Sequence, residues 1–333
     1  MTISFKEQAD HERGFSALWD RHVAPDFNVY RETFYKIRRK GRATMLVGVV
    51  ATIAAFLFFG RFGPAIFLFP IVAVAAFFFT LRSYAPLFRA QKEMSEKFLT
   101  ALNEHFSDRV VPLKRRSAMQ DIFDELADEG MAPRDPAIIG ASYGAIDSEF
   151  VFFNATVKRE TTSMTRDEND QPNNRTFTYQ HFLVVQMRLD TNCSTPIRVT
   201  PDSKLGNMFT KLTKDWSRVE MDNAAFEKNF EVYCDDVGVA KAVFTEAVQG
   251  AFASMREYYS RNRPRLKGKL RIHCLIKAEH MTLIFDDLDD VSGAKLTGRT
   301  PEKLVDAAHA GLARMAETIK IVDTYRDLIP ILR

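Results

Sequence analysis

The feature that most constrains this chain is an apolar run over residues 44–81, in which Arg61 is the only charged residue. About 20 apolar helical residues cross a membrane core, so this run is too long for a single crossing. Residues 60–64 read Gly-Arg-Phe-Gly-Pro, which is typical of a turn. The run therefore predicts a transmembrane hairpin with spans of about 44–60 and 64–81.

Basic residues flank this hairpin on both sides. Before it come Arg31, Lys36, Arg38, Arg39, Lys40 and Arg42, and after it come Arg82, Arg89, Lys92 and Lys97. Since positive charge favours the cytoplasmic side, both ends of the chain are predicted to lie in the cytoplasm. The three cysteines form neither a disulfide framework nor a metal motif, which agrees with a reducing compartment. We expect a two-span protein of the cell inner membrane.

Three parts are predicted along the chain: a basic amphipathic cytoplasmic segment (1–43), the transmembrane hairpin (44–81) and a cytoplasmic domain (82–333). A helix is expected over 90–106. Strands are expected at 137–143, 150–159, 175–189, 196–200 and 230–234, with a hairpin made by 270–276 and 281–285. Further helices are expected around 224–229, over 246–259 with Thr245 as its cap, and from Pro301 to near residue 328. Strands followed by helices are typical of an α+β fold with a mainly antiparallel sheet and flanking helices.

Composition and motifs exclude several functions. The net charge of +3 is too small for a nucleic-acid-binding protein. No phosphate-binding glycine loop and no nucleophile-elbow motif is present, so no cofactor and no catalytic residue is expected. His273, Cys274, His280 and Cys234 could supply zinc ligands, but adjacent strand residues point to opposite faces, so we expect no metal site. The acidic run at 286–290 fits turns and caps, with a divalent-cation site as the alternative.

One basic run stands out near the C-terminal third of the chain. Six basic residues occupy alternate positions: Arg261, Arg263, Arg265, Lys267, Lys269 and Arg271. In an extended conformation they would project from one side. This pattern fits contact with anionic lipid headgroups or with a partner, and it equally fits a solvated loop leading into a strand.

A family resemblance follows from residues 219–248, which read VEMDNAAFEKNFEVYCDDVGVAKAVFTEAV. The segment resembles the signature of a bacterial family known as domain of unknown function 3137. The matching residues are Glu220, Phe226, Glu227, Phe230, Val232, Tyr233, Asp236, Ala240, Lys241 and Thr245. The resemblance implies a bacterial membrane protein and supplies no activity or cofactor. Phe226, Phe230 and Val232 are interpreted as anchors that pin a short helix to the sheet, with Glu227 and Asp236 as helix caps.

The predicted spans contain almost no polar side chains, whereas ionisable residues usually mark a transport path. We therefore expect a membrane anchor and a cytoplasmic binding or scaffold protein without catalysis of its own. It would recruit a protein partner or ligand at the inner face of the membrane. An unrecognised hydrolase or cation-dependent enzyme is one alternative hypothesis. An oligomeric channel or transport subunit, formed by several copies of the chain, is another.

Overall fold

The computed structural model describes residues 4–39, 68–113, 116–132, 137–145, 149–162, 175–202, 216–262, 271–286 and 300–328. The chain divides into two compact units. The first unit holds residues 1–105 and 293–313, and the second holds 106–292 and 314–333. Helix α9 (Pro301–Leu328) therefore gives its first half to one unit and its second half to the other. The predicted division into residues 1–43, 44–81 and 82–333 stays a prediction.

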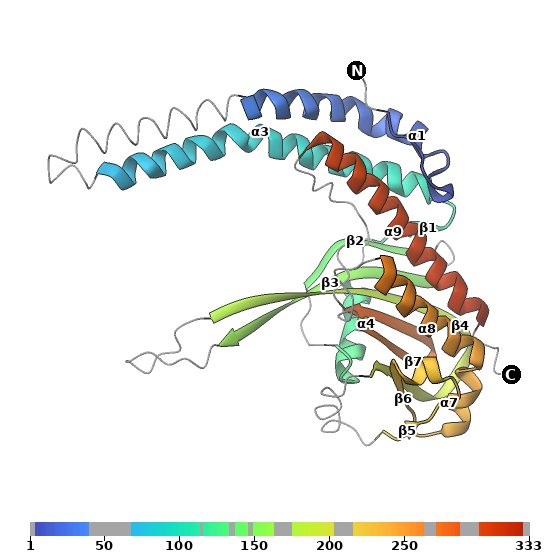
Figure 1. The fold of residues 1–333 in the computed structure, drawn as a ribbon. Helices are drawn as coiled ribbons and strands as arrows, with labels where there is room; N and C mark the ends of the chain where they lie inside the picture. The colour runs from blue at the N-terminus through green and yellow to red at the C-terminus, as the bar shows by residue number, and fades with distance from the viewer. Residues whose placement is uncertain are drawn as a thin grey trace, which may run out of the picture. The chain divides into compact units, whose positions relative to one another are not determined.

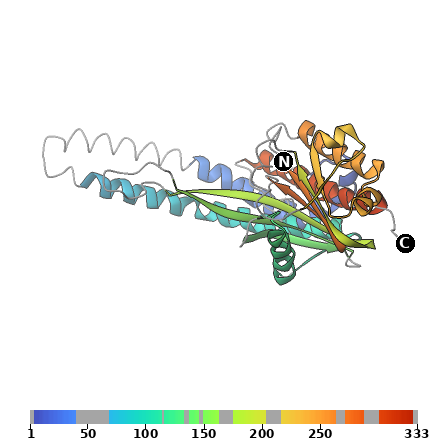
Figure 2. The same ribbon diagram turned by 90° about the horizontal axis from the view of Figure 1, so that it is seen from below.

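The first unit is helical. Its elements are η1 (Asp10–Glu12), α1 (Phe15–Leu18), η2 (Trp19–Val23), the helical residues 24–39, α3 (Leu68–His105) and the start of α9. Figures 1 and 2 show residues 24–39 alongside α3. Phe15 of α1 is fully buried, with its ring 5.0 Å from that of Phe5 and 6.0 Å from that of Phe98 in α3. The aromatic residues spaced along the N-terminal segment thus form the core of this unit.

Helix α3 joins two segments that the sequence predicts as separate helices. It continues through Pro86, so the described part of the second predicted span and the predicted helix 90–106 form one element. Proline removes one backbone hydrogen bond and crowds the carbonyl four residues before it, yet this 38-residue helix continues on both sides of Pro86. Among the described residues, no helix combines the length and the apolar character needed to cross a membrane. Residues 44–60 and 64–67 of the predicted hairpin lie outside the described residues.

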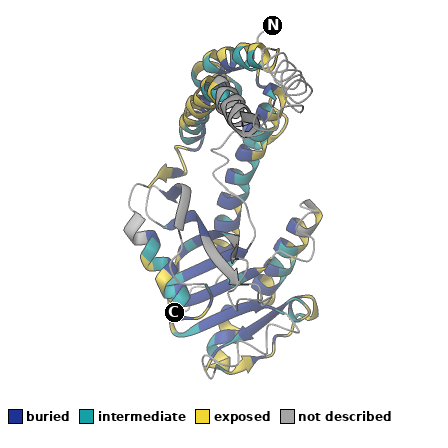
Figure 3. Ribbon diagram, turned by 90° about the vertical axis from the view of Figure 1, so that its left-hand side faces the viewer, coloured by how far each residue is buried: buried dark blue, intermediate teal, exposed yellow. Residues whose placement is uncertain are grey.

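The second unit is built on one antiparallel sheet of seven strands, which are largely buried (Figure 3). The strands are β1 (Val110–Pro112), β2 (Ala137–Ala145), β3 (Phe150–Thr162), β4 (Arg175–Pro201), β5 (Arg218–Val219), β6 (Phe230–Tyr233) and β7 (Ile272–Asp286). Their order is β1-β2-β3-β4-β6-β5, and β7 also pairs with β4. The predicted α+β class with an antiparallel sheet is confirmed.

Strand β7 folds back on itself. The backbone N–H of Asp286 donates to the carbonyl of Arg271 at 2.9 Å, which brings the two ends of the strand together. Ala278, near the middle, has a φ of 50°, as a tight reversal of the chain requires. The predicted hairpin of 270–276 and 281–285 is therefore present.

Strand β4 merges two predicted strands, 175–189 and 196–200, into one long element. Its first half pairs with the second arm of β7, where Val184 lies opposite Ile284. Its second half pairs with the first arm, where Val199 lies opposite Cys274. The register shifts between Arg188 and Cys193, where β4 passes the tip of the β7 hairpin. No break occurs because the bulge keeps the chain extended.

Helices cover both faces of this sheet (Figure 1). Helix α4 (Arg116–Asp128) packs on one face, with the ring of Phe123 5.9 Å from that of Phe182. Helices α6 (Ala224–Glu227), α7 (Val237–Val243) and α8 (Glu246–Asn262) follow in sequence. Phe182 lies opposite Asp286 in the sheet, and adjacent strand residues point to opposite faces, so Phe285 points away from the face that α4 covers. Tyr259 of α8 contacts Phe285 and therefore packs on this second face.

Candidate functional site

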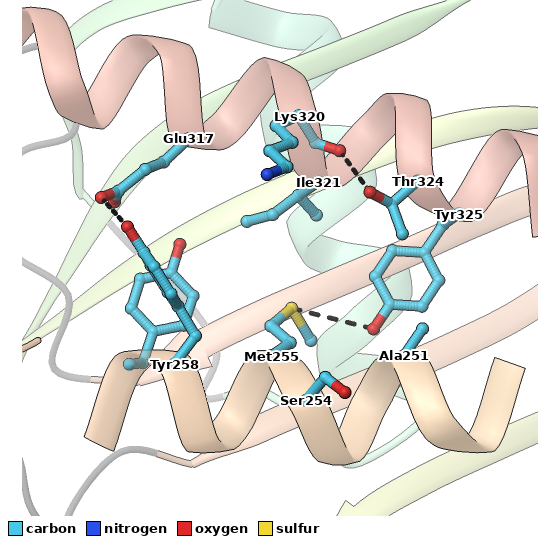
Figure 4. Close-up of a pocket in the computed structure, with 10 residues that line it drawn as sticks. Ala251, Ser254, Met255, Tyr258, Glu317, Lys320, Ile321, Thr324 and Tyr325 are labelled. Atoms are coloured by element: carbon cyan, nitrogen blue, oxygen red, sulfur yellow. Dashed lines mark hydrogen bonds between the residues drawn. The ribbon is translucent and has the colours of Figure 1, made fainter. Parts of the chain in front are cut away.

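A groove of about 290 Å³ lies between α8 and the second half of α9, within the second unit (Figure 4). Helix α8 lines it with Ala251, Ser254, Met255, Tyr258 and Tyr259. Helix α9 lines it with Glu317, Lys320, Ile321, Thr324 and Tyr325. Each set recurs at intervals of three or four residues, which places its members on one side of a helix. The two helices run antiparallel, since Tyr258 contacts Glu317 and Met255 contacts Tyr325.

Local sequence signals and core packing fix these two helices. The hydroxyl of Thr245 accepts a hydrogen bond from the amide of Val248 at 3.4 Å, so Thr245 caps α8 as predicted. Farther along α8, the ring of Phe252 lies 5.0 Å from that of Tyr325 in α9. Phe252 is fully buried and also contacts Phe226 and Phe230 near the sheet. The groove is therefore held by the same apolar core that supports the sheet.

The floor of the groove is apolar and carries one buried hydroxyl. Met255, Tyr259, Ile321 and Tyr325 are all buried. Tyr325 is only 1% exposed, and its hydroxyl donates to the sulfur of Met255 at 3.8 Å. Burial raises the pKa of Tyr325 well above its ordinary value, so this hydroxyl keeps its proton. A thioether is a weak acceptor, so the floor offers a donor that is poorly satisfied.

The rim of the groove is polar. Tyr258 is 45% exposed and donates to a carboxylate oxygen of Glu317 at 2.7 Å. The hydroxyl of Thr324 donates to the carbonyl of Lys320 at 2.8 Å, and the Lys320 side chain is exposed. Glu317 and Lys320 carry opposite charges, so the rim has no net charge.

This arrangement can bind a ligand but has no evident catalytic constellation. The groove lining contains neither histidine nor cysteine, the usual bases and nucleophiles of covalent catalysis. Across the described part of the chain, no three His, Cys, Asp or Glu side chains gather in a way that could hold a metal ion. Of the acidic run at 286–290, only Asp286 is described, and it lies 3.7 Å from the ring of His273.

The six predicted basic residues are only partly described. Arg261 lies in the last turn of α8 and forms an ion pair with Glu257, so it does not belong to an extended segment. Arg271 is exposed immediately before β7. Arg263, Arg265, Lys267 and Lys269 lie outside the described residues, and their contact with lipid or a partner stays a prediction.

Three aromatic and aliphatic residues of the family motif lie at the junction of α6 and the sheet. Phe226, Phe230 and Val232 are fully buried, and the rings of Phe226 and Phe230 stack at 5.2 Å. They belong to the core that carries α8, not to the groove lining.

Polar residues of the motif hold the turns beside it. Asp236 caps α7 by accepting from the amide of Val239 at 3.0 Å. Glu227 caps no helix: its carboxylate accepts from the amide of Met221 at 2.7 Å and thus closes the loop before α6. Asn223 is the residue that caps α6, because its side chain accepts from two amides of the first turn.

Tyr233 of the motif is half-buried on β6 and belongs to a polar cluster. Its hydroxyl donates to the carboxylate of Glu231 at 2.7 Å. Burial, with the neighbouring carboxylate, raises the pKa of Tyr233 to about 12. Arg198 of β4 and Arg218 of β5 lie opposite Tyr233 in the sheet, which places all three on one face. This cluster ties three strands together.

The groove residues were missed by the sequence analysis, although both helices were predicted. Their signal is the series Met255, Tyr258 and Tyr259 along one side of α8, with Ile321 and Tyr325 at the same spacing on α9. A single amphipathic helix does not reveal which other helix it meets, so the groove appears only once α8 and α9 are paired.

Fold and groove together define an α+β domain with an antiparallel sheet and a groove between two of its helices. Residues 182–296 match the model of the family described as a protein of unknown function (DUF3137). The predicted family is thereby confirmed for the segment from Phe182 of β4 through β7, which includes α8 but not α9. No curated protein and no solved structure matches the chain.

Proposed function

We propose that this protein is a membrane-anchored binding protein that recruits a protein partner or ligand at the cytoplasmic face of the inner membrane. The observation that carries the binding role is the α8–α9 groove, with its apolar floor, aromatic side chains and polar rim. Concave, mainly apolar sites with a few placed polar groups are the usual binding sites of proteins.

The anchor rests on the sequence. The apolar run 44–81 is long enough for two short crossings, and basic residues flank both of its ends. Its only charged residue is Arg61, at the expected turn, which supports an anchor and not a transport path.

The test uses the full chain in cells. Cells carrying the tagged protein are cross-linked, membranes are separated, and the protein is purified in mild detergent for mass spectrometry. Ser254→Arg places a long charged side chain at the groove rim, and Ala247→Arg places the same side chain at an exposed position of α8 outside the groove.

The expected result is that the protein is recovered in the membrane fraction with a stoichiometric partner or ligand. This partner or ligand should be lost with Ser254→Arg and kept with Ala247→Arg. Recovery of the chain in the soluble fraction would contradict the anchor. A partner or ligand that survives both substitutions equally would contradict the groove as its binding site.

A further inference from the structure

We infer that the α8–α9 groove binds an uncharged apolar small molecule that carries one hydrogen-bond acceptor of the carbonyl type. This inference rests on the proposed function, since it names the ligand class of the same groove. Three properties of the groove carry it: its size, the buried hydroxyl on its floor and the charge balance of its rim.

The size of the groove fits a small molecule. Its volume of about 290 Å³ is close to the lower end of the range for small-molecule sites, roughly 300–1,000 Å³. The buried floor residues Met255, Tyr259 and Ile321 supply apolar contact area along the space between the helices. A slender apolar molecule can lie along this floor.

The hydroxyl of Tyr325 selects for an acceptor. It is buried at the floor, and Met255 is its acceptor within the part of the chain that the structure describes. Figure 4 shows this hydroxyl directed into the space between the two helices, toward Met255. Because sulfur accepts weakly, a carbonyl oxygen placed there would satisfy the donor better and would orient the ligand.

The rim selects against charge. Glu317 and Lys320 stand on the same helix at the groove edge, so an anion near Lys320 would also approach a carboxylate, and a cation near Glu317 would approach an ammonium group. The Glu317 carboxylate is moreover engaged by Tyr258. An uncharged ligand avoids repulsion from both the carboxylate and the ammonium group.

The probe for this inference is benzophenone, which combines two apolar rings with one carbonyl and labels nearby C–H groups under ultraviolet light. The full chain is reconstituted in lipid nanodiscs, and labelled peptides of α8 and α9 are quantified by mass spectrometry over a range of probe concentrations. Diphenylmethane, which lacks the carbonyl, and the anion 4-benzoylbenzoate serve as competitors.

Saturable labelling of the groove peptides is expected. Both competitors should bind more weakly than benzophenone, diphenylmethane because it lacks the carbonyl and 4-benzoylbenzoate because it is charged. Tyr325→Phe removes only the hydroxyl and should weaken benzophenone binding about fivefold, while the affinity of diphenylmethane, corrected for that of the probe, is unchanged. Met255→Leu keeps the floor apolar but removes the competing sulfur, so benzophenone should bind at least as tightly as it does to the unaltered chain. A collapse of the groove would instead weaken both ring compounds.

Equal benzophenone affinity in the unaltered chain and Tyr325→Phe, or labelling that never saturates, would overturn the inference. If labelling fails but Ser254→Arg still removes the partner or ligand found in cells, the binding role stands and only the ligand class is wrong. If labelling follows the expected pattern but the chain is recovered outside membranes, the ligand class stands and the anchor is wrong.

Discussion

The carboxylate of Glu12 and the imidazole of His309 lie 2.6 Å apart, although 297 residues separate them in the chain. Glu12 is only 2% exposed, and its second oxygen accepts from the amide of Gln8 at 2.6 Å. The ring of Phe5 stacks on His309 with 4.2 Å between centroids. The N-terminal segment is therefore fastened to α9 by a buried, hydrogen-bonded carboxylate.

We expect Glu12→Gln to destabilise the helical unit by about 1–3 kcal/mol, because a buried charged hydrogen-bonding group loses its charge and part of its bonding. Chemical denaturation followed by circular dichroism measures this cost. Asp10→Asn is the matched control: the Asp10 side chain is 98% exposed and its ion-pair partner in the described part of the chain is exposed Arg13, so the substitution should cost less than about 1 kcal/mol. Equal costs for the two variants would contradict the role given to Glu12.

The contribution of Glu12 should depend on pH. Burial alone would raise the pKa of its carboxyl, but hydrogen bonds from the Gln8 amide and from His309 outweigh burial and hold the pKa below 4.5. Since the folded pKa is lower than the unfolded one, the stabilisation is full above the ordinary carboxyl pKa and is lost as pH falls through the folded value. The stability gap between the unaltered chain and Glu12→Gln should therefore be wide at about pH 6 and narrow at about pH 3. A gap that stays constant would show that ionised Glu12 is not the cause.

Tyr233 should stabilise the sheet in the opposite pH range. We expect Tyr233→Phe to cost about 1 kcal/mol, because buried Glu231 loses its hydroxyl donor. The folded pKa of about 12 lies above the ordinary value of 10.0, so this contribution is full below the ordinary pKa and is lost as pH rises through the folded one. Alkaline titration of tyrosinate absorbance measures the shift. If the tyrosine that disappears from the titration of Tyr233→Phe is one that ionises near the ordinary pKa, the raised pKa of Tyr233 would be contradicted.

The packing of α4 on the sheet should depend on Phe123. Its side chain is fully buried in a cluster with Met119, Leu126, Phe182 and Ile284. Phe123→Ala leaves a cavity there and should cost about 3–5 kcal/mol of unfolding free energy. Asp121→Ala, at an exposed position of the same helix, should change it by less than about 0.5 kcal/mol. Similar denaturation midpoints for both variants would mean that α4 adds little to the core.

Membrane topology can be tested with introduced cysteines. The native residues Cys193, Cys234 and Cys274 are at most 3% exposed, so they should react slowly with maleimides in the folded protein. An impermeant maleimide should label Arg61→Cys in intact cells but label Ala247→Cys, at an exposed position of α8, only after lysis. Labelling of Ala247→Cys in intact cells would place the α+β unit outside.

Local signals explain which parts of the fold were predictable. Thr245 and Pro301 mark helix starts in the sequence. Helix α8 begins at Glu246, directly after Thr245, and α9 begins at Pro301 itself. The β7 hairpin was predicted from its two apolar runs, although its reversal uses Ala278 at positive φ and not the glycine that such a conformation favours. These elements depend on residues close together in the chain.

Long-range pairing explains what was not predictable. The stretch between the two predicted strands joins them into one strand, β4, because it passes the tip of β7, where Cys193 lies opposite Ala278. The groove likewise depends on the meeting of α8 with α9. The hydrogen bond between Glu12 and His309 could not be predicted from neighbouring residues either, since an isolated glutamate before a helix usually lies in solvent.

The split of α9 between the two units has a consequence for synthesis of the chain. At about 5–20 residues per second, a ribosome needs roughly 15 to 60 seconds to travel from Glu12 to His309. Until His309 is made, the aromatic side chains of the N-terminal segment lack the α9 residues of their unit, and the strands of the sheet are translated in the meantime. The first unit, although its synthesis starts first, therefore cannot be completed until residues 293–313 follow most of the second unit from the ribosome.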